Sequence, residues 1–342
     1  MEISVIIPVY NAEKTLQRTL DALRVQDFFS FEVILVDNGS TDKSSSICKE
    51  NCQKDSRFRY RYTEKKGVSN ARNIGVSESR AKYLCFCDAD DIPEVNMLSA
   101  LHNKISKSNY GMAMCNYYSE RDNRNSEFPF QWGDVLDDES IRTKLIPAMF
   151  FSETGGDVIW GTVWRAIFRR NIIVEHKLKF DEKLTFAEDL CFFLEYLNCI
   201  SSLILESKVL YKYSMVEGSA MLSYNRYKEH IFEERMYLIS KIDITMKNIF
   251  GFNVPKSLQN KLNTIYQEYI LECIGNACIL EEKNMRRRAF ERVERIVNSS
   301  MVREIFCEID VENLRKKLMF ELIKHRCRRM ITLYYLLRKK LI

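Results

Sequence analysis

Three acidic residues follow an apolar run: Tyr83–Cys87 is uncharged, and Asp88, Asp90 and Asp91 come directly after it. An uncharged run of this length between polar residues predicts a buried strand of a mainly parallel sheet. Ligands bind at the carboxyl ends of such strands. Crowded carboxylates repel one another unless a cation lies among them, and their hard oxygen atoms suit Mg²⁺ or Mn²⁺. A solvated turn with a helix cap is the alternative, because Asp is common in both.

A second acidic pair, Glu188-Asp189, stands much later in the chain. Phe186, Leu190 and Phe193 around it recur at helical spacing, which predicts a helix that begins near the pair. An acid in the first turn of a helix is stabilised by the helix dipole. Helix capping is therefore one interpretation of this pair.

The elements that must position these acids alternate between strand-like and helix-like segments from residue 3 to about 118. This alternation predicts an α/β fold, Rossmann-like, with a mainly parallel sheet flanked by helices. We expect strands at residues 4–9, 31–36, 58–62 and 83–87. Because each strand ends in polar residues, these ends are expected to meet at one edge of the sheet.

Two helix starts are predicted from polar residues that follow glycines. Gly39 permits a turn after the second strand, and Ser40 or Thr41 can cap the helix beyond it. Ser69, shortly after Gly67, is expected to cap the next helix.

Composition places the chain among ordinary globular proteins, since 46% of its 342 residues are hydrophobic and 29% are charged. The amino terminus lacks the basic leader and long apolar run of a signal peptide, so we expect a cytoplasmic location. No GxGxxG follows the first strand and no GxxxxGK[ST] occurs. A nucleotide bound here would need another anchor for its diphosphate, which a metal held by Asp88 and Asp90 could supply.

Four short motifs together resemble the inverting family 2 glycosyltransferases of GT-A fold in their order and spacing. The resemblance is close over residues 1 to about 120 and looser to about 220. The motifs are Val5–Glu13, Val36–Asp42, Ala71–Asn73 and Asp88–Asp90.

The resemblance implies a set of donor-binding residues. Pro8 and Tyr10 would line the pocket for the uracil of the donor, and Asp37 or Asn38 would bind the base or ribose. Arg72 would lie near the diphosphate. In the DxD motif, Asp88 would face the ribose or sugar and Asp90 would ligate Mg²⁺ or Mn²⁺. The full implied set is Pro8, Tyr10, Glu13, Asp37, Asn38, Arg72, Asp88 and Ala89 for the donor, with Asp88 and Asp90 for the metal.

The sequence departs from the family pattern in two places. Asn38 stands where many members have a second Asp, and Lys65-Lys66 occupies a stretch where Asn is frequent.

The same resemblance assigns the later acids and aromatic residues to acceptor chemistry. Glu188-Asp189 is similar to a glutamate-aspartate motif in which the Asp is the catalytic base, so Asp189 is the implied base and Glu188 an acceptor-binding residue. Trp160 and Trp164 are two of the three tryptophans, and indole faces suit the apolar faces of sugars. Packing in the core is the alternative for these indoles. The stretch from Tyr211 to Ser219 resembles a mobile loop that closes over the donor.

The predicted organisation is a GT-A domain at residues 1–225, divided into a nucleotide-sugar half (1–118) and an acceptor half (119–225), and a helical region at 226–342. Residues 314–342 contain ten Lys or Arg and one acid, Glu321, giving a formal charge of +9. We expect one basic amphipathic helix here. It could bind an anionic membrane surface at the cytoplasmic face, pack on the enzyme or bind a partner. Nucleic acid is not an expected partner, because the aromatic stacking platforms expected for binding single strands are not interleaved with these cations.

These features favour a metal-dependent inverting glycosyltransferase. It would transfer a hexose from a UDP-linked sugar to a hydroxyl of a lipid-linked glycan acceptor, in surface polysaccharide synthesis. One alternative is a sugar nucleotidyltransferase, although the chain lacks the glycine-rich basic loop expected at its amino terminus. Another is a catalytically silent nucleotide-sugar-binding or scaffold subunit, against which the set of Asp88, Asp90 and Asp189 argues.

Overall fold

The structure of the protein, a computed structural model, describes residues 1–151, 158–159, 161–215, 228–251, 253–279, 286–307 and 314–338. The chain divides into two units. The amino-terminal unit comprises Met1–Glu217 and Asn248–Phe250, and the carboxyl-terminal unit comprises Gly218–Lys247 and Gly251–Ile342.

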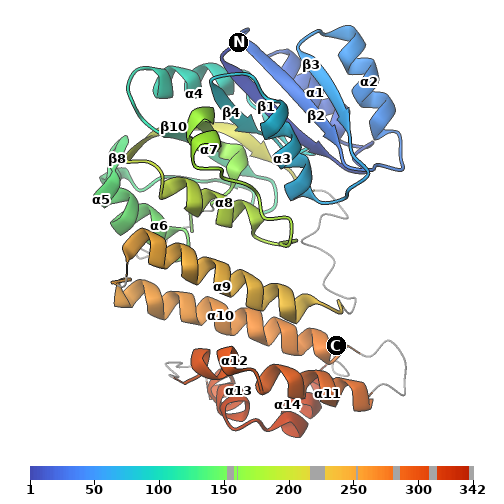
Figure 1. Cartoon of the computed structure of the whole chain (residues 1–342), viewed down its shortest axis with the longest axis vertical. Helices are drawn as coiled ribbons and strands as arrows, with labels where there is room; N and C mark the ends of the chain where they lie inside the picture. Colours follow the sequence, from blue (N-terminus) through green and yellow to red (C-terminus); the bar gives the residue numbers. More distant parts are fainter. Residues whose placement is uncertain are drawn as a thin grey trace. The chain divides into compact units, whose positions relative to one another are not determined.

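One mixed sheet organises the amino-terminal unit (Figure 1). Its main path runs β3-β2-β1-β4-β9-β6-β10-β5, and β7 and β8 pair beside it with β6 and β10. The four expected strands are present and pair in parallel as β3-β2-β1-β4. The strands are β1 (Ile3–Val9), β2 (Phe31–Asp37), β3 (Phe58–Tyr62), β4 (Tyr83–Phe86), β5 (Ile92–Pro93), β6 (Met112–Ser119), β7 (Arg124–Asn125), β8 (Val135–Asp137), β9 (Ala166–Arg169) and β10 (Ser202–Tyr213).

Helices surround this sheet and connect its parallel strands (Figure 1). The α-helices are α1 (Leu16–Arg24), α2 (Ser44–Lys54), α3 (Val68–Glu78), α4 (Met97–Ser106), α5 (Asp138–Ser140), α6 (Ile146–Ala148), α7 (Arg170–Glu175) and α8 (Glu188–Leu197). Short non-α turns of helix lie at Phe130–Trp132, Ile141–Leu145 and Val163–Arg165. Helix α3 packs so tightly on β1 that a Cβ at Gly75 would lie 2.3 Å from Ile6 Cγ2. This close approach fixes α3, which carries Arg72, against the centre of the sheet.

Both predicted helix caps are wrong. Helix α2 begins at Ser44, and the hydroxyls that were expected to cap it bind Asn11 instead: Ser40 Oγ accepts from the Asn11 N–H at 3.1 Å, and the Thr41 hydroxyl donates to the Asn11 side-chain oxygen at 3.3 Å. Helix α3 begins at Val68, so Ser69 lies inside its first turn and its hydroxyl donates to the Asp181 carbonyl at 3.0 Å. In both places a tertiary contact uses the group that would otherwise have capped a helix.

Helices make up the carboxyl-terminal unit. They are α9 (Ile231–Phe250), α10 (Lys256–Ala277), α11 (Arg286–Val297), α12 (Ser300–Ile305), α13 (Leu314–Lys324) and α14 (Arg328–Arg338). The single tail helix expected from residue 314 is wrong, because the segment forms two helices. Arg326 adopts φ +56° between them, a left-handed conformation that ends a helix. Among the described helices, none has the length and apolar character needed to cross a bilayer.

Candidate active site

The acidic turn after β4 is fixed by a hydrogen-bonded network around Asp91. The carboxylate of Asp91 is fully buried and accepts from the Tyr211 hydroxyl at 2.8 Å and from the Ser214 N–H at 2.8 Å. The Tyr211 oxygen in turn accepts from the backbone N–H of Asp88 at 3.2 Å. Asp91 therefore holds the turn from inside, while Asp88 stays 28% exposed.

Sequence reasoning treated Asp91 only as one of the clustered acids and placed Tyr211 in a loop over the donor, so it did not assign either residue to holding the turn. The position of Asp91 directly after Asp90 was a usable signal for this residue. Nothing in the sequence showed that Tyr211 reaches this turn, and the expectation of a loop at Tyr211–Tyr213 is wrong, since these residues end strand β10. Ser214 and Met215 follow the strand without regular secondary structure, and residues 216–219 of the predicted loop lie outside the described residues.

Arg72 joins the acidic turn to helix α8. Its Nη2 donates to Asp88 Oδ1 at 3.1 Å and its Nη1 donates to Glu188 Oε1 at 2.8 Å. The side chain is only 4% exposed, and its guanidinium carbon lies 5.3 Å from the centre of the Phe180 ring. One buried cation thus brings together the DxD motif and the glutamate-aspartate motif, which are far apart in sequence.

Asp189 lies in the first turn of α8, directly after Glu188, the residue that pairs with Arg72. The preceding Ala187 adopts φ +58°, a strained conformation for a residue with a Cβ, and such strain is found where a side chain must be aimed. Burial and the negative charge of Glu188 raise the pKa of Asp189 to about 7, although Arg72 opposes the shift. A carboxyl group with a pKa near neutrality is suited to general-base catalysis.

The Asp90 carboxylate lies in surroundings that disfavour its negative charge, so a nearby cation would stabilise it. Burial and the nearby charge of Asp88 raise its pKa to about 6. Its main-chain oxygen accepts from Arg18 at 2.6 Å, which fixes the backbone of the turn. Within the described ranges, no three His, Cys, Asp or Glu residues are grouped to hold a metal ion. Asp88 and Asp90 nevertheless fit Mg²⁺ or Mn²⁺ in the mode in which one or two carboxylates bind together with substrate phosphates.

Pro8 lies near the end of β1, and Tyr10 and Glu13 lie in the loop that follows this strand. Pro8 pairs in register with Val36 near the carboxyl end of the parallel strands. Tyr10 is 47% exposed, and the Lys66 ammonium lies 5.5 Å from the centre of its ring. Glu13 accepts from the backbone N–H of Lys43 at 3.1 Å, so its carboxylate holds this loop against the start of α2.

The loop after β2 separates the roles of Asp37 and Asn38. Asp37 is fully buried and accepts from the Ser40 N–H and the Tyr60 hydroxyl, both at 2.9 Å. Asn38 is also buried, but its side-chain oxygen has no hydrogen-bond partner among the described residues. A buried acceptor without a partner is costly, and a bound ligand can satisfy it. Asn38 is therefore better placed than Asp37 to bind a base or ribose.

Ala89, between the two DxD aspartates, contributes through its backbone. Its carbonyl oxygen accepts from the hydroxyls of Thr15 at 3.0 Å and Thr19 at 3.2 Å, which anchors the acidic turn to helix α1.

Trp164 is a core residue in the structure. It is 5% exposed and stacks on Tyr211 with ring centres 4.5 Å apart and on Tyr213 at 5.6 Å. Of the two interpretations of Trp164, packing in the core therefore fits the structure. Its indole stacks on Tyr211, whose hydroxyl donates to Asp91. Trp160 lies outside the described residues. The carboxylate of Glu188, the third predicted acceptor-binding residue, forms an ion pair with Arg72.

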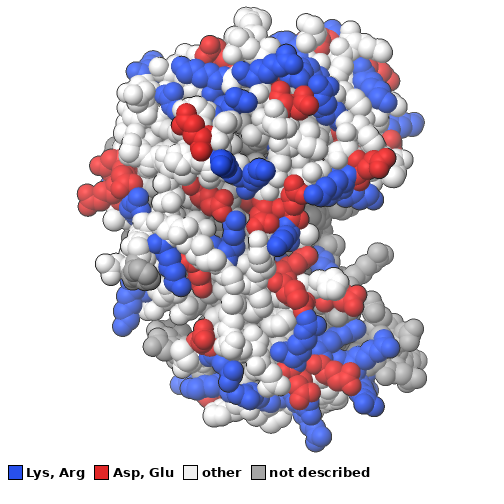
Figure 2. All heavy atoms as spheres, viewed as in Figure 1, with Lys and Arg blue, Asp and Glu red and all other residues white. Residues whose placement is uncertain are grey.

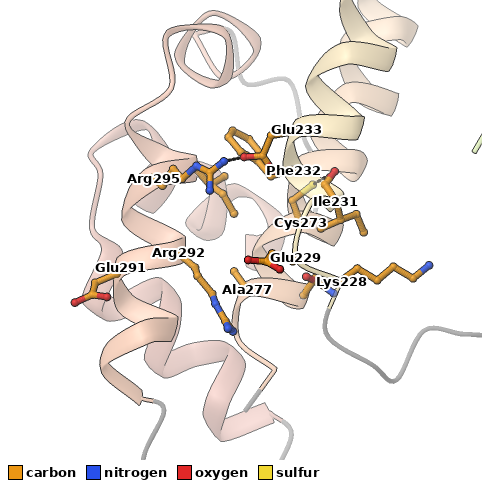
Figure 3. Close-up of a pocket in the computed structure, with 12 residues that line it drawn as sticks. Lys228, Glu229, Ile231, Phe232, Glu233, Cys273, Ala277, Glu291, Arg292 and Arg295 are labelled. Atoms are coloured by element: carbon orange, nitrogen blue, oxygen red, sulfur yellow. Dashed lines mark hydrogen bonds and ion pairs between the residues drawn. The ribbon is translucent and has the colours of Figure 1, made fainter. Parts of the chain in front are cut away.

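A pocket of about 230 Å³ lies in the carboxyl-terminal unit (Figure 3). Its wall mixes acids and cations, and Glu233 forms an ion pair with Arg295. Burial raises the pKa of the Cys273 thiol in this wall to about 12, so the thiol is unreactive at neutral pH. The acidic turn, Arg72 and Asp189 described above all belong to the amino-terminal unit.

The comparison with protein families matches residues 4–173 to the model described as glycosyl transferase family 2. Among curated proteins, the chain is 28% identical over 305 residues to the uncharacterized glycosyltransferase EpsJ of Bacillus subtilis, which covers 88% of this chain and 85% of that protein. It is 34% identical over 170 residues to the glycosyltransferase GlyA of Streptococcus pneumoniae, covering 48% of this chain and 24% of GlyA.

Two solved structures share the fold. S. aureus TarS 1–349 in complex with UDP-GlcNAc superposes with a TM-score of 0.63 at 18% identity, covering 98% of this chain and 89% of TarS. The mannosyltransferase PcManGT from Pyrobaculum calidifontis, in complex with GDP-Man and Mn²⁺, superposes with a TM-score of 0.52 at 14% identity, covering 99% and 88%.

Proposed function

Because the chain belongs to glycosyl transferase family 2 and has the GT-A fold, we propose that this glycosyltransferase is metal-dependent and inverts configuration. It transfers a hexose from a nucleotide sugar to a hydroxyl of a glycan acceptor. The acceptor is lipid-linked and belongs to surface polysaccharide synthesis at the cytoplasmic face of the membrane. Residues 1–225 carry the reaction and residues 226–342 form a separate helical region.

The Arg72 bridge is the observation that carries the proposal. Arg72 joins Asp88 to Glu188, the neighbour of Asp189 in sequence, and this supports one site that combines the proposed carboxylates for the leaving diphosphate, Asp88 and Asp90, with a proposed base of raised pKa, Asp189. In the reaction, Asp189 accepts the proton of the acceptor hydroxyl as the hydroxyl oxygen bonds to the anomeric carbon. The bond from that carbon to the diphosphate oxygen breaks on the opposite face. General-base catalysis of this kind contributes about 10² to 10⁴ in rate.

The residues near the leaving group have distinct tasks. Asp88 and Asp90 would hold Mg²⁺ or Mn²⁺, which when bound neutralises negative charge on the diphosphate. Arg72 keeps Asp88 and Glu188 in place, and Tyr211 fixes the backbone of the turn on which both aspartates depend.

We propose UDP as the nucleotide, with Asn38 and the exposed ring of Tyr10 at the base. The unsatisfied side-chain oxygen of Asn38 can accept from the imide N–H of uracil. The TarS structure holds UDP-GlcNAc, whereas PcManGT holds GDP-Man, so the same fold accommodates both bases.

A thermal-shift screen tests the proposal. UDP-sugars and GDP-sugars are each added to the full chain with and without Mn²⁺, because a ligand that binds only the folded state raises the melting temperature. We expect a rise with a UDP-sugar that depends on Mn²⁺ and is lost in Asp90→Ala. A rise with GDP-sugars alone would overturn the choice of base, and a rise independent of Mn²⁺ would overturn metal dependence.

A further inference from the structure

Helix α14 has an inner face that is already packed. Ile331 and Thr332 are fully buried, and the Tyr335 hydroxyl donates to the Leu271 carbonyl of α10 at 3.4 Å. Arg328, at the start of α14, forms an ion pair with Glu294 of α11. These contacts fix the orientation of α14 within the carboxyl-terminal unit.

The opposite face of α14 is apolar and exposed. Met330, Leu333, Tyr334 and Leu337 are 58%, 54%, 38% and 53% exposed. Their spacing of i, i+3, i+4 and i+7 places them on one side of the helix, here called the outer stripe. A surface helix normally carries polar residues opposite its packed face. A helix that is apolar on both faces therefore implies a second apolar neighbour for the outer stripe.

The segment that carries the outer stripe is rich in cations. Lys324, Arg326 and Arg329 are exposed, and residues 314–342 carry a formal charge of +9 with Glu321 as the single acid. At the bottom of the view in Figure 2, over the region of α11 to α14, many Lys and Arg side chains lie beside Asp and Glu side chains. We therefore expect the binding partner of the outer stripe to have an apolar surface with negatively charged groups around it.

We propose that the outer stripe and its cations bind the surface of a lipid bilayer that contains anionic lipids. An apolar helix face of this size inserts at the boundary between headgroups and acyl chains, while Lys and Arg contact the lipid phosphates. A second copy of the chain is a poorer occupant for two reasons. Four side chains of one helix offer far less than the roughly 800 Å² per partner of a stable interface, and two tails of charge +9 repel each other.

This inference does not depend on the identity of donor or acceptor, and it corrects the expected single tail helix. The predicted apolar stripe of the tail is divided between two faces, because Met319, Ile323 and Ile331 are buried whereas Met330 and Tyr334 are exposed. The surface offered to lipid is therefore one short face of α14.

Vesicle sedimentation with the full chain tests the proposal. Phosphatidylcholine vesicles are compared with vesicles that also contain phosphatidylglycerol, at low and high NaCl. We expect binding to the mixed vesicles, weakened by salt, and little binding to phosphatidylcholine alone. Leu333→Glu with Leu337→Glu is expected to lower the partition coefficient by at least about tenfold. Lys324→Glu is expected to lower it by about fivefold or more.

Phe29→Glu provides the matched control, since Phe29 is 81% exposed in the amino-terminal unit and its replacement should leave binding unchanged. UDP release from the donor is measured in parallel and should be unchanged in the stripe variants, which separates this inference from the proposed function. Equal binding to both vesicle types, or full binding by the stripe variants, would overturn the inference. A dimer in light scattering that the stripe variants disperse would also overturn it and assign the stripe to a second copy.

Discussion

Replacing Arg72 by Met removes the cation that joins the two acidic motifs while keeping an apolar side chain over Phe180. In the wild type, Arg72 donates to Asp88 and Glu188 and lowers the pKa of Asp189 against the effect of burial. Without it, three carboxylates face one another in a largely buried site. We expect loss of stability and of transfer activity.

The size of the stability loss follows from burial. Removing one partner of a buried ion pair costs about 3 to 5 kcal/mol, because a buried charge loses its partner. Asp88 is 28% exposed, so water can solvate part of its charge. We therefore expect the lower end, about 3 kcal/mol, at pH 8.

The loss should depend on pH. The pKa of Asp189 is raised in the folded protein, so between its ordinary value of 3.8 and about 7 the folded state holds a proton that the unfolded chain has released. The stability contributed by this group therefore falls as pH rises through that window. Without Arg72 the folded pKa rises further, and the window extends upward. The cost of Arg72→Met should then be larger at pH 8 than at pH 5.5.

Urea unfolding followed by tryptophan fluorescence measures this loss. Trp132, Trp160 and Trp164 all precede residue 218, so the signal reports on the amino-terminal unit. Arg61→Met is the control, because Arg61 forms an exposed ion pair with Glu78 at 3.0 Å, worth about 1 kcal/mol or less. A loss for Arg72→Met no larger than that of the control, or equal at both pH values, would refute the reasoning.

Three other predictions concern turnover. The rate of UDP release with acceptor present should rise with pH through about 7, because Asp189 must be ionised to accept a proton; a flat profile from pH 5.5 to 8.5 would contradict this. Tyr211→Phe should raise the donor KM by about tenfold with a smaller effect on kcat, since two hydrogen bonds worth about 1 kcal/mol each are lost at the acidic turn; an unchanged KM would show that Tyr211 does not position it. Asp90→Ala should weaken donor binding and kcat together, and calorimetry that finds full UDP affinity with Mn²⁺ would exclude Asp90 as a metal ligand.

Local patterns were sufficient to predict the nucleotide-side strands. The segments at residues 31–36 and 58–62 appear as β2 and β3 almost to the residue, because both are short, rich in β-branched or aromatic residues and bounded by turn residues. The start of a helix at Glu188 was also predicted from apolar spacing and acids in the first turn.

Long-range contacts decided what the sequence could not show. The pairing of Arg72 with both Asp88 and Glu188 depends on how α3, β4 and α8 converge on one sheet edge. Tryptophan is a residue type suited to binding sugars, yet Trp164 stacks on Tyr211. This contact depends on how distant segments of the chain pack together. The break at Arg326 interrupts an apolar stripe that continues in sequence, so periodicity alone predicted one helix where there are two.

The most direct test of the central claim compares Asp189→Asn with the wild type in two measurements on the same protein: UDP affinity in the presence of Mn²⁺, and transfer from the donor to an acceptor. Asn is close to Asp in shape but cannot accept the acceptor's proton at neutral pH. The account predicts nearly unchanged UDP affinity and a loss of transfer of about 10² or more. Transfer near the wild-type rate would contradict the assignment of Asp189 as the base.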